Sequence, residues 1–224
     1  MPALRLPARG PGPLPPLAVV GIDADDGQFV RHVGLAAEGR DPFGPPHAIP
    51  IAHMVPPFES RSDEVAVQTC GFLPLSAGEA EKVALFIDEI RDELHAARQL
   101  EQYTILPHAD AARDADGMVL HRKFSCAGFV VEAYRFAVID LVATAFEELP
   151  TVGLDAVCRA YPEQRRHLEN PRLRERMNLR GPGPWPILLP GYVINALCRP
   201  AYRIRAPGGA YRPRAGDEFF PHET

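Results

Sequence analysis

Short apolar runs near the N-terminus are separated by turn-forming residues, and this pattern predicts a sheet. Residues 17–22 and 28–37 are mainly apolar, and the acidic and glycine residues at 23–27 favour a turn between them. Residues 47–54 predict a third strand, in which Pro50 indicates an edge or a bulge because proline lacks a backbone donor. The N-terminal part of the chain is therefore expected to form strands.

Two later segments have the spacing of amphipathic helices. The first begins with the capping-box pattern of residues 76–79 and keeps a helical period to about residue 99. The second begins at Cys126 and is expected to run to about residue 147, with an apolar face marked by Phe129, Val130, Ala133, Phe136, Ala137 and Asp140. Between them, residues 107–118 predict a polar loop and residues 119–124 predict a brief strand.

The composition after Pro150 is different. Residues 153–180 are rich in arginine with interspersed acids, which favours the solvated face of a helix pair over a basic binding patch. Residues 181–186 predict a rigid turn, and residues 187–197 are apolar enough to pack on the core.

Size and charge limit the classes of function. A chain of 224 residues with 46% hydrophobic residues predicts one domain with an ordinary core. The formal net charge of −5 gives no nucleic-acid footprint, so no nucleic-acid partner is expected. The first 16 residues lack the apolar core of a signal peptide and no run is long enough for a membrane span, so we expect a cytoplasmic protein.

Cys126 is the strongest candidate for chemistry because it stands between small residues at the predicted start of a helix. Unpaired backbone N–H groups and the helix dipole favour a thiolate there, and the thiolate is the nucleophilic form. We therefore expect a lowered pKa and a sulfur that faces a groove. The alternative is a buried cysteine that packs as a small hydrophobe.

A thiol nucleophile needs an imidazole base, which a third polar group orients. His32, near the start of a predicted strand, is the candidate base, and we expect it roughly 3–5 Å from the sulfur. His47 and His53 share one face of the next strand, and either can supply the orienting group. A zinc site built from His32, His47 and Cys126 is a weaker alternative, because the position of the thiol at a helix start favours a nucleophile.

Two short motifs resemble those of a known family. Ser125-Cys126-Ala127-Gly128-Phe129-Val130 resembles the helix start of NlpC-type papain-like cysteine peptidases, and His32-Val33-Gly34-Leu35 resembles their histidine strand. The histidine precedes the cysteine here, as in the circularly permuted branch that includes YiiX-like amidases and lecithin:retinol acyltransferase-like enzymes. The resemblance covers roughly residues 20 to 145.

The resemblance implies an α+β, permuted papain-like fold, in which an antiparallel sheet packs on the Cys126 helix. It divides the chain into an arm (1–16), a catalytic domain (17–149) and an extension on the same domain (150–224). It implies a cysteine hydrolase, an amidase or peptidase, with Cys126 as nucleophile, His32 as base and His47 as the favoured orienting group. No cofactor or metal is expected. The alternatives are a thiol acyltransferase on lipid or peptide substrates, and a non-catalytic protein that keeps the groove.

Overall fold

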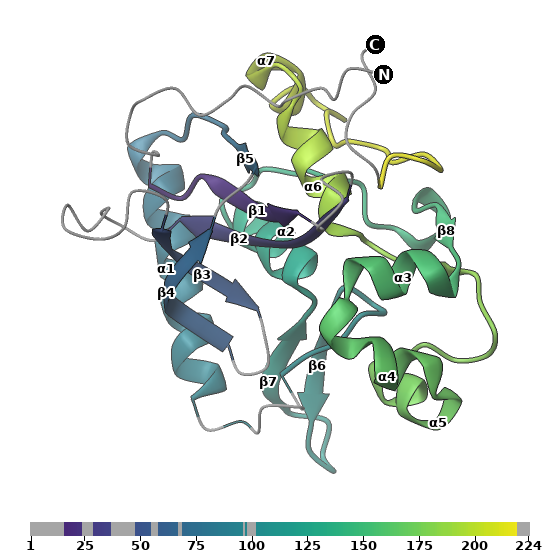
Figure 1. The fold of residues 1–224 in the computed structure, drawn as a ribbon. Coiled ribbons are helices and arrows are strands. Elements are labelled where there is room, and N and C mark those ends of the chain that lie inside the picture. The colour runs from purple at the N-terminus through teal and green to yellow at the C-terminus, as the bar shows by residue number, and fades with distance from the viewer. Residues whose placement is uncertain are drawn as a thin grey trace.

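The computed structural model describes residues 16–23, 29–36, 48–54, 58–66, 69–95, 97 and 102–218 (Figure 1). Helices and antiparallel sheets are both present, as the α+β prediction states. The largest sheet has the strand order β4-β3-β2-β1-β5. Its strands are β1 (Val19–Asp23), β2 (Val30–Ala36), β3 (Ala48–Met54), β4 (Phe58–Ala66) and β5 (Thr69–Gly71).

Side chains alternate between the two faces of this sheet, as the two-residue period of a strand requires. One face contributes Val19, Leu35 and Ala52 to the main core, and the other carries a small cluster of Ala18, Val20, Ala36 and Ile51. Strand β3 lies inside the sheet, and its pairing with β4 shifts register between Ile49 and Ile51. Pro50 is therefore at a bulge and not at an edge.

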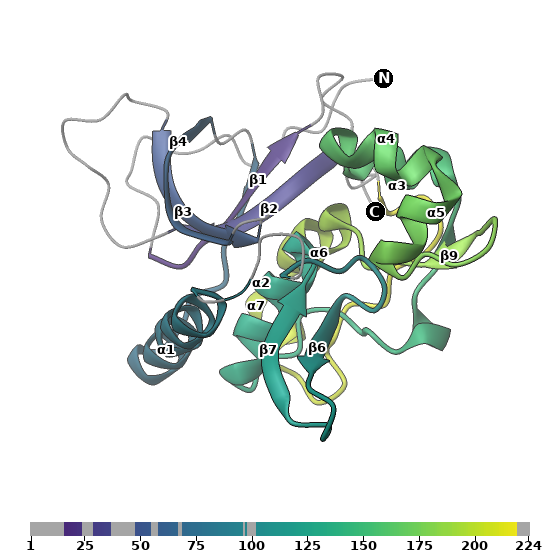
Figure 2. The same cartoon turned by 90° about the horizontal axis from the view of Figure 1, so that it is seen from below.

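Helices α1 (Ala77–Leu94) and α2 (Cys126–Phe136) lie against the same face of the sheet as α6 (Pro190–Leu197) (Figure 2). The predicted capping box begins α1, where the Ser76 side chain accepts from the Glu79 N–H and the Glu79 carboxylate accepts from the Ser76 N–H. The helix ends at Leu94, earlier than the expected residue 99. Its buried residues recur at the helical period of the sequence, and they are Val83, Phe86, Ile87, Ile90 and Leu94.

The expected length of the Cys126 helix was wrong. Helix α2 ends at Phe136, and Val138 adopts a left-handed conformation with φ of 64°. The Ile139 N–H donates to Tyr134 O at 3.0 Å, which turns the chain back on the last turn of the helix. Asp140 is exposed and is not part of the apolar face. Apolar residues continue past the turn, so periodicity alone did not mark the helix end.

Residues 107–118 were expected to be a loop, but they contain a strand. Strand β6 (Ala109–Arg113) pairs with β7 (Val119–Phe124) as an antiparallel hairpin that ends just before the Cys126 helix. The sequence here is polar because the hairpin is largely solvent-exposed, so it lacks the apolar alternation of a half-buried strand.

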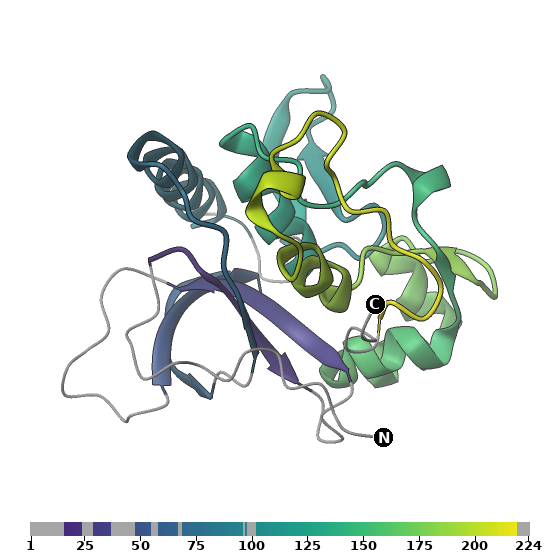
Figure 3. The same ribbon diagram turned by 90° about the horizontal axis from the view of Figure 1, so that it is seen from above.

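Short elements make up the C-terminal third (Figure 3). They are η2 (Phe146–Glu148), β8 (Thr151–Val152), α3 (Leu154–Ala160), η3 (Pro162–Gln164), α4 (Arg165–Glu169), α5 (Pro171–Arg174), η4 (Glu175–Met177), β9 (Trp185–Pro186) and α7 (Ala201–Ile204). One hydrophobic cluster contains residues from both sides of residue 150, so this part shares its core with the sheet and α2. In the described part of the chain, no helix has the length and apolar character needed to span a membrane.

Candidate active site

The start of α2 is held by its cap and by a neighbouring loop. Ser125 is the N-cap, and its Oγ accepts from the Gly128 N–H at 3.0 Å. The Ser125 N–H in turn donates to His108 O at 2.9 Å. Cys126 is consequently the first helical residue, as the sequence predicted, and its backbone position is fixed from both sides.

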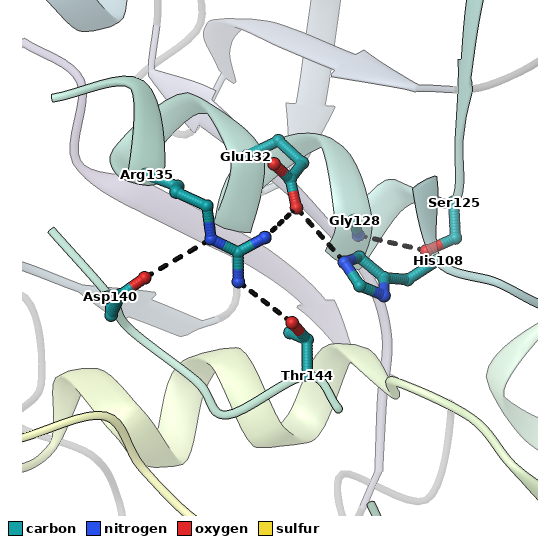
Figure 4. Close-up of polar contacts among 7 residues, drawn as sticks. All are labelled: His108, Ser125, Gly128, Glu132, Arg135, Asp140 and Thr144. Carbon is teal, nitrogen blue, oxygen red and sulfur yellow. Dashed lines mark hydrogen bonds and ion pairs between the residues drawn. The ribbon is translucent and has the colours of Figure 1, made fainter. Parts of the chain in front are cut away.

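The loop that carries His108 contacts α2 closely because Gly128 has no side chain. A Cβ at Gly128 would lie 1.9 Å from His108 O, which is far inside van der Waals contact. The His108 ring reaches along the helix, where its Nε2 lies 3.1 Å from Glu132 Oε1 (Figure 4). Arg135 bridges Glu132 to Thr144 Oγ1, 2.9 Å from its Nη2, and therefore ties the helix to the next segment.

Gly128→Ala is expected to destabilise the protein by about 3 kcal/mol or more, because the new methyl group overlaps a backbone carbonyl that cannot move freely. Gly78→Ala is the matched control, since it also lies in the first turn of a helix but has no atom within 4 Å of the added Cβ. That control is expected to be stabilising by about 0.5–1 kcal/mol. Urea denaturation of both variants measures the difference, and equal stabilities would contradict the close approach.

The Cys126 side chain is fully buried, contrary to the expectation of a groove-facing sulfur. Burial raises the pKa of its thiol to about 11, although the Val33 N–H, the N–H groups at the helix start and the Tyr103 hydroxyl act in the opposite direction. The expected lowering of the pKa is therefore wrong for this conformation. The helix start does favour the thiolate, but the loss of hydration is the larger effect.

His32 forms a hydrogen bond with His53. Its Nε2 lies 2.6 Å from His53 Nδ1, and the ring planes meet at 75°. Burial, followed by the charges of His53 and Arg31, lowers the pKa of His32 to about 3. His32 is therefore neutral at physiological pH, and a neutral imidazole has a lone pair that accepts a proton.

Gly34 makes room for this pair. His32 and Gly34 lie on the same face of β2, and a Cβ at Gly34 would lie 2.8 Å from the Cβ of His53. The histidines are therefore diagonal neighbours on adjacent strands, a spacing that long side chains can span. The glycine of the His-Val-Gly motif thus has a steric role in the pairing.

Strand β2 also connects His32 with the cysteine. The backbone N–H of Val33, the residue after His32, is directed at the Cys126 thiol and lowers its pKa. The expected separation of His32 and the sulfur remains a prediction. His47 lies outside the described residues, so its predicted role and the zinc alternative that needs it also remain predictions. Among the residues that the structure describes, no group of three or more His, Cys, Asp or Glu side chains is placed to hold a metal ion.

Sequence reasoning did not identify two tyrosines that lie beside Cys126. Tyr103 is placed by its bridge to Phe124, at the end of β7, and Tyr161 follows α3. The two rings make an edge-to-face contact with centroids 6.3 Å apart. They are 58 residues apart in the chain, so no local motif joins them.

Comparison of the chain with protein-family models, with curated proteins and with solved structures gave no match. Arguments about its function therefore rest on the geometry around Cys126 and His32.

Proposed function

We propose that the protein is a cysteine-dependent hydrolase of amide or peptide bonds, with a permuted papain-like arrangement of its site. Cys126 is the nucleophile, His32 the base, and His53 the group that orients His32. The observation that carries this proposal is the convergence of the helix start at Cys126 with strand β2, whose Val33 N–H is directed at the thiol and whose His32 is paired with His53.

The hydrogen bond between the histidines sets the ring nitrogen that reacts. If His32 Nε2–H donates to His53 Nδ1, the remaining Nδ1 of His32 carries a lone pair. That atom takes the thiol proton as the sulfur attacks the substrate carbonyl. The C–S bond forms, and the carbonyl π electrons move to oxygen. Collapse of this intermediate expels the amine, which takes the proton from His32, and water then releases the acid from the acyl-enzyme.

The pKa values suit a neutral pair better than an ion pair. A thiol with a pKa of about 11 and an imidazole with a pKa of about 3 are both uncharged near neutrality. The proton must therefore move during the attack and not before it, which is general-base catalysis. Acyl transfer to a nucleophile other than water uses the same first step.

Acylation by p-nitrophenyl acetate tests this proposal. The wild-type protein is expected to acquire one acetyl group on Cys126, seen by mass spectrometry, and to lose it by hydrolysis. Cys126→Ala is expected to abolish this acetylation, whereas Cys158→Ala, which alters another buried thiol, should leave it intact. A wild-type protein that is never acetylated at Cys126 would contradict the proposal.

The second candidate is a non-catalytic binding protein. The complete burial of Cys126 and its raised pKa favour this candidate, because an inert structural cysteine has both properties. In that case the polar groups around Cys126 only hold the fold together, and acetyl esters give no acyl-enzyme.

A further inference from the structure

Tyr161 has a buried hydroxyl group that nothing in the described part of the chain satisfies. The residue is 5% exposed, and its Oη has no hydrogen-bond partner there. Buried polar groups in folded proteins almost always have a partner, so an unpaired hydroxyl is unusual. The phenolic O–H is a donor, and it is therefore available to a group outside the described residues.

The surroundings of this hydroxyl belong to the candidate active site. The ring of Tyr161 packs edge-to-face on Tyr103, whose hydroxyl lowers the pKa of the Cys126 thiol. Tyr103 is therefore already directed at the sulfur, while the Tyr161 hydroxyl forms no well-aligned hydrogen bond in the described residues and lies close to the hydroxyls of Ser125 and Tyr103, which lower its pKa. Burial, and then the proximity of Cys126, raise the pKa of Tyr161 well above its ordinary value, so it remains a protonated donor.

The backbone holds Tyr161 in this place. The residue ends α3, where its N–H donates to Val157 O at 2.9 Å, and Pro162 begins the next helical turn directly afterwards. Helix α3 packs against β2, the strand of His32. The aromatic ring is thus supported by two elements, and a donor at the site of reaction needs such support to be preorganised.

We propose that Tyr161 is a catalytic residue that donates a hydrogen bond to the substrate carbonyl oxygen as Cys126 attacks it, an inference that rests on the proposed function. When the C–S bond forms, the carbonyl oxygen gains the electron pair, and the Tyr161 hydroxyl stabilises that charge without giving up its proton. Collapse of the intermediate returns the electron pair to the carbonyl and breaks the bond to the leaving group.

Two reagents separate this role from a structural one. Acylation by p-nitrophenyl acetate creates an oxyanion, whereas alkylation by iodoacetamide is a displacement at carbon and creates none. Tyr161→Phe is expected to slow acylation of Cys126 by roughly a hundredfold, at the lower end of what losing one oxyanion donor costs. Alkylation of Cys126 is expected to stay within about twofold of the wild-type rate, because the ring and the thiol remain in place.

Tyr192→Phe is the matched control. Its hydroxyl is also buried and forms no well-aligned hydrogen bond in the described residues, but the groups that act on its pKa are Glu218, Asp217 and Tyr211 and not Cys126. This control is expected to change neither rate. Both phenylalanine variants should unfold near the wild-type urea concentration, since each removes a hydroxyl that forms no well-aligned hydrogen bond in the described residues.

Three other outcomes would contradict the proposed role of Tyr161. Equal acylation of the wild-type and Tyr161→Phe proteins would overturn the proposed role of the hydroxyl. A parallel fall in acylation and alkylation would also overturn it, because it would show that the residue controls access to the thiol. A wild-type protein that is alkylated at Cys126 but never acylated would remove the proposed hydrolase itself, and with it this role of Tyr161.

Discussion

Replacing His32 with alanine is expected to lower the rate constant for acylation of Cys126 by at least about tenfold, which is less than the roughly 10² to 10⁴ contributed by a general base whose pKa lies near neutrality. The reason is that the thiol, with a pKa of about 11, has almost no thiolate at neutral pH and depends on a neighbour to remove its proton. His32, with its pKa of about 3, is present in the accepting form at neutral pH. The measurement is the rate of p-nitrophenol release.

The acylation rates of the wild-type protein and of His32→Ala are expected to depend differently on pH. Between about pH 3 and about pH 11, His32 stays neutral and the Cys126 thiol stays protonated. Acylation of the wild-type protein is therefore expected to be nearly independent of pH between about 5 and 9. In His32→Ala only the thiolate reacts, and its fraction rises tenfold with each pH unit in this range.

Two further histidine variants complete the comparison. His53→Ala should lower the rate less than His32→Ala, because His53 positions the base and does not remove the proton from the thiol. His95→Ala is the control, since this exposed residue follows the last turn of α1, and we expect it to have no effect. A wild-type rate that itself rises tenfold per pH unit would show that His32 takes no part in the reaction.

Cys126 is expected to react with iodoacetamide at least about a hundredfold more slowly in the folded protein than in urea. Burial raises its pKa from 9.0 to about 11, which alone lowers the thiolate fraction at neutral pH about a hundredfold. Complete burial of the side chain slows the reaction further. Mass spectrometry of alkylated peptides, sampled over time, gives the rate for each cysteine separately.

Cys198 distinguishes the two causes of this slow reaction. It is exposed, yet burial of its thiol group also raises its pKa to about 11. Cys198 should therefore react about tenfold faster with each pH unit between 8 and 10, while Cys126 stays slower than Cys198 throughout. Rapid alkylation of Cys126 in the native protein at pH 7 would show that this thiol is accessible to the reagent and that its pKa is not raised.

Local features of the structure could be predicted because local residues determine them. Ser125 caps α2 through the Gly128 N–H three residues on, and Ser76 and Glu79 cap α1 within one turn. The first strand has two buried faces, which agrees with the continuous apolar run of residues 17–22. The α+β class, the position of Cys126 at a helix start and the place of His32 on a strand therefore followed from the sequence alone.

The tertiary structure decided the properties that depend on residues far apart in the chain. The partner of His32 is set by the register of β2 and β3, and the two histidines are separated by 21 residues. Periodicity reports which face of a strand is buried but not which residue it meets. The same limit applies to the end of α2, where apolar residues continue although Val138 turns the chain.

The ionisation of Cys126 shows this division most clearly. Its sequence context, a thiol at a helix N-terminus, favours a lowered pKa, and those local N–H groups do act in that direction. Burial outweighs them, because desolvation depends on every segment packed around the sulfur, including strand β2 and the tyrosines at 103 and 161. The sequence by itself determined that Cys126 stands at the start of a helix, and only the folded chain determined how strongly its thiol holds its proton.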